Sequence, residues 1–420
     1  MLNSPRAPRL YYGWIITLAL AVTTTVAWGI LYYSFSVFLI PMEAELGVAR
    51  AELSGAFSLA LLVSGAAALP VGRWIDHHGA RGLMTAGSLG AAALLWAWAN
   101  VRGLPALYLV FAGLGLAMAA MLYDPAFAVL AAWFNRRRRG ALTLLTLVAG
   151  LASTIFVPLA NALLAAYGWR RAIEILAVLL LLLTGPLHVL VLRRRPHDLG
   201  LAPDGDPLSP PGAPGRPYLP DGHAPRAVVR RPSFWLLTVA YMLNGGVAVA
   251  AGVHFLAFLV GQGYPAEYAA VLAGLVGLMQ LPGRLIFEPL ARRIHRRWLS
   301  AGVIAVQGGA VLLLLGAPTP ARLAAFVALF GMANGLLTLT RATVVAELYG
   351  AAHYGAISGL MSFWSTLARA AGPTVVALLY TATGGYAAAW LMLAAVTLVA
   401  VVAYLAADRP GVAELAEAGA

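Results

Sequence analysis

Twelve runs of apolar residues, each long enough to cross a lipid bilayer as a helix, follow one another along this chain of 420 residues. About 20 residues suffice, because a helix rises ~1.5 Å per residue and the hydrocarbon layer is roughly 30 Å thick. Only 10% of the residues are charged, whereas soluble proteins contain about 25%. The sequence therefore predicts an all-α membrane protein with twelve transmembrane helices. The runs cover roughly 12–40, 51–72, 82–100, 104–133, 140–166, 171–192, 233–261, 266–290, 299–317, 321–349, 354–382 and 385–407.

The arginines are distributed unevenly among the connections between these runs. All 28 basic residues are arginine; 20 lie near the termini or in even-numbered connections, and only five lie in odd-numbered ones. Positive residues accumulate on the cytoplasmic side of membrane proteins, so both termini and the even-numbered connections are predicted to be cytoplasmic. We expect an integral protein of a bacterial inner (plasma) membrane. The five arginines on the opposite side are Arg50, Arg102, Arg170, Arg171 and Arg322.

The chain repeats itself across its middle. Segment 194–231 is polar and proline-rich, which is typical of a flexible cytoplasmic linker. It separates six apolar runs in 1–193 from six in 232–420, and WIITLA at Trp14 corresponds to WLLTVA at Trp235. Two related six-helix bundles predict a secondary transporter, with its binding site between the bundles near the middle of the membrane.

The connection after the second run reads GRWIDHHGAR. Together with the twelve runs and the central linker, this segment resembles the major facilitator superfamily, whose loop at this place has the pattern GxxxDxxGxR. The resemblance implies the major facilitator fold, in which two pseudo-symmetric six-helix bundles expose a central site alternately to either side. It also implies a gating role for Gly72, Asp76, Gly79 and Arg81. We expect Glu347, near the end of the tenth run, to meet this basic loop.

Two further segments are similar to the monocarboxylate and oxalate/formate transporter group of that superfamily. They are YGW at 12–14 and WFNRRRRG at 133–140, with Ala149-Gly150 following inside the fifth run. This similarity implies a small carboxylate as the substrate. On the residues alone, the four arginines 136–139 are interpreted as a cluster that sets orientation and binds lipid headgroups.

Five ionisable residues lie deep inside apolar runs, where a charge costs about 2.5–3.5 kcal/mol unless it faces a polar cavity or a partner. They occur in runs 4, 7, 8, 10 and 11, whereas the interiors of runs 3, 9 and 12 contain none. In the resembled fold the first set lines the central cavity. Three arginines against one carboxylate predict an anionic substrate, because a guanidinium binds a carboxylate through two parallel hydrogen bonds. The five residues are Asp124, His254, Arg284, Arg341 and Arg369.

The three arginines are the predicted substrate-binding cations, and each has an alternative structural role. Arg284 follows Pro282 and precedes Glu288 by one helical turn, so it can pair with carbonyl groups freed by the proline or with that carboxylate. Arg341 can form a salt bridge with Asp124 between the bundles. Arg369 lies near Gly372-Pro373, a predicted helix break whose carbonyl groups need partners.

Four other residues complete the predicted site. Asp124 and His254 are candidates for carrying a proton, since an ionisable residue inside a membrane can bind and release one; alternatively, each is a satisfied polar residue. Asn244 beside a glycine pair and Tyr33 in the first run are predicted to contact substrate. The alternative for Tyr33 is a place in the aromatic belt at the membrane interface.

The function that fits these residues is alternating-access, proton-coupled transport of a small organic anion, with a monocarboxylate favoured. The alternatives are an anion exchanger, an inorganic-anion carrier, or a proton-driven exporter of lipophilic compounds. The chain contains no cysteine and no hydrolase, metalloprotease or nucleotide-binding motif, so we expect no enzyme, metal site or cofactor. The expected partners are the anion, a proton and membrane lipids, without nucleic acid, and the protein is expected to be a monomer.

Overall fold

The computed structural model describes residues 11–48, 50–206 and 222–408, and nearly all of them are helical. In the first half, α1, the π-helix η1 and α2 form one continuous crossing, and α3 and α4 form the next two. The fourth crossing is divided into α5 and α6, and the fifth into α7 and the start of α8. The helices are α1 (Tyr12–Ala27), η1 (Trp28–Tyr33), α2 (Ser34–Leu46), α3 (Arg50–His78), α4 (Ala80–Ala99), α5 (Leu104–Met121), α6 (Tyr123–Trp133), α7 (Arg138–Ala149) and α8 (Ala152–Leu190).

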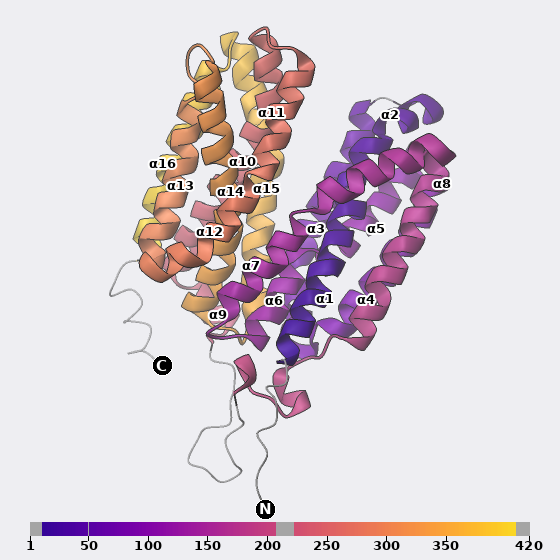
Figure 1. Ribbon diagram of the computed structural model, residues 1–420, viewed down its shortest axis with the longest axis vertical. Helices are drawn as coiled ribbons and strands as arrows, with labels where there is room; N and C mark the ends of the chain where they lie inside the picture. The colour runs from indigo at the N-terminus through magenta and orange to yellow at the C-terminus, as the bar shows by residue number, and fades with distance from the viewer. Residues whose placement is uncertain (1–10, 49, 207–221, 409–420) are drawn as a thin grey trace, which may run out of the picture.

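Helix α8 contains the second part of the fifth predicted run and nearly all of the sixth. Gly168 has a φ of 74°, a left-handed conformation that glycine adopts without steric cost, and the chain reverses there. Figure 1 shows the two parts of α8 as one rising and one descending segment. The second half is built from α9 (Pro225–Val229), α10 (Pro232–Gly261), α11 (Ala266–Leu278), α12 (Gln280–Arg293), α13 (Arg296–Leu312), α14 (Pro320–Tyr349), α15 (Tyr354–Thr383) and α16 (Ala387–Ala407).

Nine helical segments of the described residues are long and apolar enough to cross a membrane. One of them, the 53-residue segment Arg138–Leu190, makes two crossings because of the reversal in α8. Helices α13 and α15 correspond to the two remaining predicted runs. The predicted fold class, an all-helical membrane protein with the major facilitator fold, is therefore confirmed.

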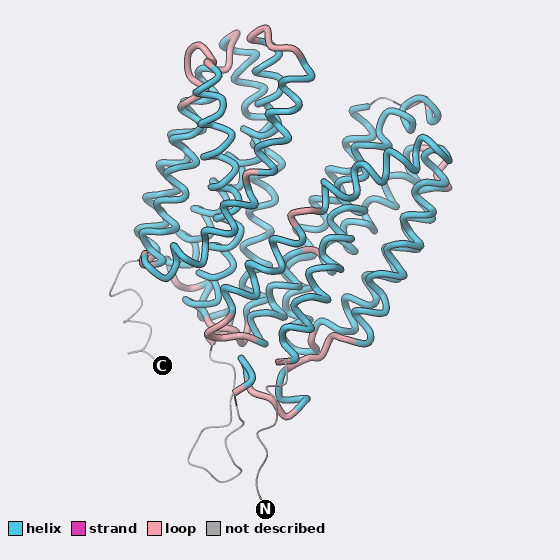
Figure 2. The backbone as a smooth tube through the Cα atoms, viewed as in Figure 1, coloured by secondary structure: helices cyan, strands magenta, loops and turns pink. Residues whose placement is uncertain are grey.

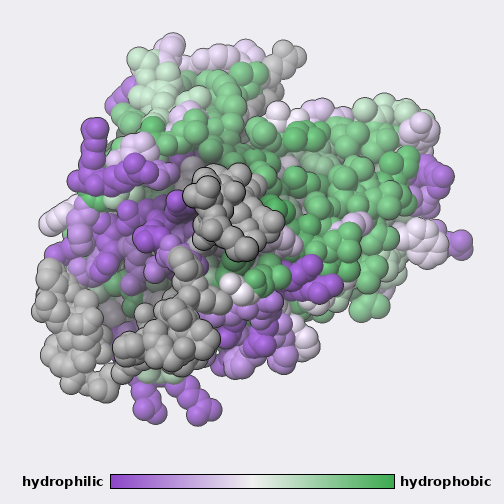
Figure 3. Space-filling model, turned by 60° about the horizontal axis from the view of Figure 1, so that its bottom comes forward, coloured by the Kyte–Doolittle hydropathy of each residue, from purple (hydrophilic) through white to green (hydrophobic). Residues whose placement is uncertain are grey.

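The helices form two bundles that approach each other at one end of the molecule and diverge at the other (Figure 1). The described parts of the linker lie at the end where the bundles meet, and we name this the linker end (Figure 2). Hydrophilic residues gather around that end, next to a broad hydrophobic flank (Figure 3). Contacts between the bundles run mainly through α3 with α15 and α7 with α12, whereas α11 packs on α10, α12 and α14 of its own bundle.

The linker begins as ordered structure, so the expectation of a flexible chain is wrong for its first part. Two short 3₁₀ turns, Pro196–Leu199 and Pro203–Gly205, pack under the first bundle. The buried Asp204 carboxylate accepts hydrogen bonds from the backbone N–H groups of Asn135, Arg136 and Arg137 at 2.7–3.1 Å. Those N–H groups precede α7, and the carboxylate satisfies them as a helix cap would. Residues 207–221 of the predicted linker lie outside the described residues.

Candidate substrate site and linker-end gate

Arg284 of α12 is buried between the two bundles, with 5% of its surface exposed. Its Nη1 donates a hydrogen bond of 2.7 Å to the Thr146 carbonyl oxygen on α7, in the opposite bundle. Its Nη2 donates one of 3.1 Å to Gln280 Oε1, one turn earlier on its own helix. Its Nε is buried without a partner among the described residues. The guanidinium therefore bridges the bundles, and one of its N–H donors has no partner among the described residues.

The alternative considered for Arg284, a pairing with Glu288, is absent from the structure. The Glu288 carboxylate binds Arg292, one turn further along α12, at 2.7 Å. The structure gives Arg284 no carboxylate partner among the described residues, and its carbonyl partner belongs to α7 rather than to the turn around Pro282. Since burying an unpaired charge is expensive, an anion that reaches Arg284 removes an existing electrostatic cost.

A break between α7 and α8 creates the space that Arg284 occupies. Helix α7 ends at Ala149, and α8 begins at Ala152. A Cβ atom on Gly150 would lie less than 3.0 Å from Arg284 Nη1, a distance that real Cβ atoms do not adopt. The glycine in the Ala149-Gly150 pair is therefore required for the guanidinium to reach the Thr146 carbonyl oxygen.

Substitution of Gly150 by alanine is expected to displace the Arg284 guanidinium and to weaken anion binding. A hydrogen bond to a charged group contributes about 1.5–3 kcal/mol, so the KM for anion transport should rise roughly tenfold or more. Flux measurements in proteoliposomes measure this change. Gly90→Ala is the control, because a Cβ at Gly90 meets no atom within 4 Å. Equal KM values for the two variants would contradict the role of Gly150.

Arg341 of α14 and Asp124 of α6 form an ion pair between the bundles, with 3.7 Å between Nη2 and Oδ1. Ser362 of α15 joins them, because its hydroxyl accepts a hydrogen bond from Arg341 and donates one of 2.6 Å to Asp124 Oδ2. The Ser358 hydroxyl donates a longer bond of 3.4 Å to Oδ1. The alternative role considered for Arg341, a salt bridge between the bundles, is therefore present. Its contact with substrate stays a prediction.

The position of Asp124 follows from the interruption between α5 and α6. Leu122 has an extended backbone (φ −81°, ψ −154°), and α6 begins again at Tyr123. Asp124 consequently lies in the first turn of a new helix, where the helix dipole stabilises a negative charge. The carboxylate side chain remains 34% exposed despite its ion pair. A role for Asp124 in proton coupling stays a prediction.

Arg369 of α15 is exposed, and its side chain packs against Gly245 of α10. It interacts electrostatically with Arg341 and Asp124, so it faces the same region between the bundles. No carboxylate or hydrogen-bond acceptor is assigned to it in the part of the chain that the structure describes. Asn244, beside Gly245, is 4% exposed, and its Oδ1 has no partner among the described residues. The substrate contacts of Arg369 and Asn244 stay predictions.

His254 of α10 is held by two partners within its own bundle. Its Nε2 lies 2.9 Å from the Pro373 carbonyl oxygen, and its Nδ1 lies 3.2 Å from the Tyr386 hydroxyl. A carbonyl oxygen only accepts, so Nε2 carries a hydrogen and Nδ1 accepts from the tyrosine in the neutral ring. These contacts fit the alternative of a satisfied polar residue. A role for His254 in proton coupling stays a prediction.

Tyr33 lies in η1 and is close enough to Arg284 and Tyr123 for electrostatic interaction. This position is in the interior between the bundles, not in an aromatic belt. Trp28 and Tyr123 lie beside it, with 5.2 Å between their ring centroids. Sequence reasoning missed both residues, although Tyr123 directly precedes Asp124.

The predicted gating loop contacts the second bundle at the linker end. The Asp76 carboxylate accepts hydrogen bonds from the backbone N–H groups of Gly355 (3.0 Å) and Ala356 (2.8 Å), at the start of α15. A negative side chain at a helix N-terminus satisfies free N–H groups and complements the helix dipole. A Cβ on Gly72 would lie less than 3.0 Å from the Gly355 carbonyl oxygen, so α3 and α15 touch backbone to backbone.

The other two residues of the predicted gating loop, Gly79 and Arg81, lie where the chain enters α4. Gly79 has a φ of +80°, which allows the sharp turn into α4, and the Arg194 side chain packs against it. Arg194 donates a hydrogen bond to the His77 carbonyl oxygen, so the start of the linker is attached to this loop. Arg81 is exposed near the start of α4. A gating role for Gly79 and Arg81 stays a prediction.

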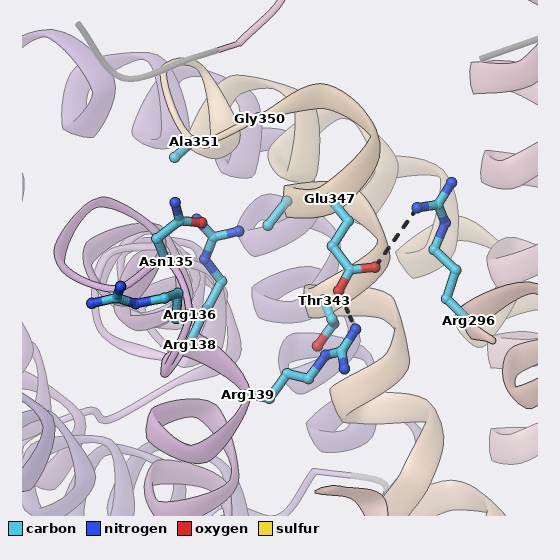
Figure 4. A pocket seen from close by; sticks show the side chains of 10 residues that line it. Asn135, Arg136, Arg138, Arg139, Arg296, Thr343, Glu347, Gly350 and Ala351 are labelled. Atoms are coloured by element: carbon cyan, nitrogen blue, oxygen red, sulfur yellow. Dashed lines mark hydrogen bonds and ion pairs between the residues drawn. The ribbon is translucent and has the colours of Figure 1, made fainter. Parts of the chain in front are cut away.

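Glu347 pairs with Arg139 at 2.6 Å and lies 4.0 Å from Arg296, so the expectation that it meets loop 72–81 is wrong. Arg139 belongs to α7, and therefore the run 136–139 contributes an ion pair between the bundles in addition to any role at the membrane surface. Figure 4 shows Glu347 between these two arginines, beside a cavity of about 560 Å³. Arg138, Thr343 and Gly350 are among the residues lining that cavity.

The arrangement of this protein, two helical bundles that meet at one end around charged residues, is typical of secondary membrane transporters. A family model described as Major Facilitator Superfamily matches residues 14–373, so the chain belongs to this superfamily. The protein is accordingly an integral membrane transporter and not an enzyme.

Several curated proteins are distantly similar over most of this chain. Monocarboxylate transporter 13 of Bos taurus is 28% identical over 392 residues, which cover 91% of this chain and 86% of that protein. Monocarboxylate transporter 11 of Mus musculus is 27% identical over 397 residues, covering 91% and 84% respectively.

Solved structures support the fold. The human organic anion transporter MFSD10 (TETRAN) superposes with a TM-score of 0.69 at 19% identity, covering 95% of this chain and all of that one. A bacterial homologue of the iron transporter ferroportin, in an outward-facing state, gives a TM-score of 0.72 at 16% identity, covering 96% of this chain and all of that one. At these identities the similarity concerns the fold alone.

Proposed function

We propose that this protein moves a small organic anion, with a monocarboxylate favoured, across the membrane by alternating access of its two bundles. The observation that carries the proposal is Arg284, a guanidinium buried between the bundles without a carboxylate partner among the described residues. Arg369 adds a second positive charge facing the same region, whereas Arg341 is already paired with Asp124. A carboxylate supplies the charge and the planar geometry that a guanidinium binds.

The conformation corresponds to one end state of such a cycle. Contacts through Gly72, Asp76 and Glu347 hold the bundles together at the linker end, and the bundles diverge at the other end (Figure 1). With the arginine-rich linker end on the cytoplasmic side, this state is open to the outside. Opening the linker end requires those inter-bundle contacts to separate, which is the switch of packed interfaces expected of alternating access.

Asp124 supplies a route for proton coupling. Protonation of its carboxylate neutralises the partner of Arg341, so the charge between the bundles then depends on the proton as well as on the anion. One proton and one monocarboxylate together carry no net charge across the membrane. The names of the similar monocarboxylate transporters favour the same substrate class. An anion exchanger or an inorganic-anion carrier uses the same arginines without the proton.

The proposal is tested with purified protein in liposomes, by following the uptake of labelled small carboxylates. Saturable uptake that increases when the outside is made acidic is expected. Flux that does not respond to a pH gradient would remove proton coupling and leave uniport or exchange. Electrical conductance without saturation would instead identify a channel and overturn the proposal.

Substitution of Asp124 by asparagine is expected to abolish the response to a pH gradient while preserving exchange of carboxylate for carboxylate. At a ratio of one proton per anion, a gradient of one pH unit supports about tenfold accumulation, and the variant should lose that accumulation. Accumulation ratios and counterflow rates in proteoliposomes measure the two activities separately. Glu174→Gln is the control, since Glu174 pairs with Arg171 outside the site. Undiminished accumulation by Asp124→Asn would exclude Asp124 as the proton carrier.

A further inference from the structure

Four aromatic side chains, Trp28, Tyr32, Tyr33 and Tyr123, form a cluster beside Arg284, and we name it the aromatic cluster. Its ring centroids lie 5.0 Å apart for Trp28 and Tyr32, 5.1 Å for Tyr32 and Tyr33, and 5.2 Å for Trp28 and Tyr123. All four residues are partly exposed. The Trp28 Nε1–H is buried without an acceptor in the described residues.

The π-helix η1 places three of these rings together. Hydrogen bonds in a π-helix join residues five apart, so Trp28 and Tyr33 lie one turn from each other, with Tyr32 beside them. On another side of η1, a Cβ on Gly29 would lie less than 3.0 Å from the Phe156 ring, so this glycine lets η1 pack closely on α8. The six residues of η1, WGILYY, therefore supply both the surface that packs on α8 and three rings of the aromatic cluster.

The aromatic cluster lies next to Arg284 and Arg369, which have no carboxylate partner among the described residues. Tyr33 and Tyr123 interact electrostatically with Arg284, and Tyr32 interacts with Arg369. Ring surfaces and guanidinium groups thus border the same space between the bundles. A ligand held there by its carboxylate places the rest of its body next to aromatic rings.

We propose that the transported anion is a carboxylate attached to an aromatic ring, such as a benzoate-type acid. This inference rests on the proposed function and specifies the substrate of the same site. The carboxylate binds Arg284, and the ring of the substrate stacks on or packs edge-on against the aromatic cluster, as aromatic pairs do at centroid distances of about 4.5–7 Å. A short aliphatic acid has no aromatic face to stack on these rings.

Inhibition of labelled benzoate uptake by unlabelled acids tests the proposal in proteoliposomes containing the wild-type protein. Benzoate is expected to inhibit about tenfold more strongly than acetate and more strongly than cyclohexanecarboxylate, which has a similar size but no aromatic face. Thermal stabilisation of the purified protein by the same three acids gives a second measurement, since a ligand stabilises the state that it binds.

A variant links the preference to the aromatic cluster. Trp28→Leu is expected to reduce the preference for benzoate over acetate severalfold while acetate inhibition changes little. Trp96→Leu is the matched control, because Trp96 is an exposed tryptophan of α4 outside the site. Retention of acetate binding by Trp28→Leu shows that the variant is folded.

The outcomes separate the two proposals. Equal inhibition by acetate and benzoate, or by benzoate and cyclohexanecarboxylate, would overturn the proposal of an aromatic substrate. The proposal of carboxylate transport would remain, and small acids would then be assayed as the labelled substrate. Absence of binding and transport for all three acids would overturn the carboxylate function, and the inference with it. An unchanged preference in Trp28→Leu would overturn the role given to the aromatic cluster.

Discussion

Replacement of Arg284 by glutamine is expected to reduce carboxylate uptake by roughly 30-fold or more. The glutamine retains hydrogen-bonding groups but removes the buried positive charge that a carboxylate pairs with. Truncating one partner of a buried, hydrogen-bonded charge pair costs about 2–5 kcal/mol, which corresponds to a ~30-fold to several-thousand-fold loss of affinity. The loss is measured from the initial rates of uptake of the labelled acid over a range of concentrations.

Substitution of Arg284 by lysine distinguishes charge from geometry. Lysine preserves the charge but presents a single ammonium group, which cannot hold the Thr146 carbonyl oxygen, the Gln280 side chain and a carboxylate in the fork arrangement of a guanidinium. We expect an intermediate loss of transport. Arg292→Gln is the control on the same helix, since that arginine is exposed and pairs with Glu288. Full transport by both Arg284 variants would refute its role as the anion site.

The large-scale arrangement of the chain was predictable because the bilayer imposes it on short segments. Each crossing needs a long apolar run, and the described helices coincide with those runs to within a few residues at most ends. A buried charge in such a run is costly, which is why Asp124, Arg284 and Arg341 were recognisable as cavity residues before their neighbours were known. In the structure all three contact the opposite bundle, through the Thr146 carbonyl oxygen or through the Asp124–Arg341 pair.

The partners of these charges depend on tertiary structure and were not predictable from local sequence. The hydrogen bond from Arg284 to Thr146 joins residues 138 positions apart, and the pair Arg139–Glu347 joins residues 208 positions apart. Local spacing allowed Glu288 to pair with Arg284, but Arg292 lies at the same helical spacing from Glu288 on the other side and binds it instead. Pattern alone gives the depth of a side chain but not the direction in which it points.

The positions of the helix interruptions were the second feature that sequence reasoning did not find, and the break predicted at Gly372-Pro373 is wrong, because α15 continues through it. The breaks at Leu122 and at Gly150-Leu151 lie within continuous apolar runs, and the π-helix η1 continues α1 without any change in composition. Two of these irregular segments contain a glycine that a side chain distant in the sequence packs against: Arg284 packs against Gly150, and Phe156 packs against Gly29 in η1. Such irregular backbone inside a membrane is tolerated where it faces protein or a polar space, and here it borders the candidate site.

Substitution of Gly72 by alanine is expected to prevent closure of the linker end and to reduce transport at least about tenfold. The added Cβ would lie less than 3.0 Å from the Gly355 carbonyl oxygen, which is backbone and cannot rotate away. Inserting a methyl group into a close-packed contact typically costs about 1–3 kcal/mol, and in this protein only the state with a closed linker end contains the contact. The variant should therefore shift towards the state in which the linker end is open.

The shift is measurable as a distance, because the natural chain contains no cysteine and accepts spin labels at chosen positions. Labels on His78→Cys and Arg293→Cys lie on exposed residues of the two bundles at the linker end. Their separation should increase in Gly72→Ala and stay unchanged in Gly82→Ala, where an added Cβ meets no atom within 4 Å. Both glycines lie in helices, Gly72 in α3 and Gly82 in α4, so a general effect of replacing a helical glycine by alanine is present in both variants. Identical distance distributions and identical transport rates in the two variants would show that the backbone contact between Gly72 and Gly355 does not hold the gate closed.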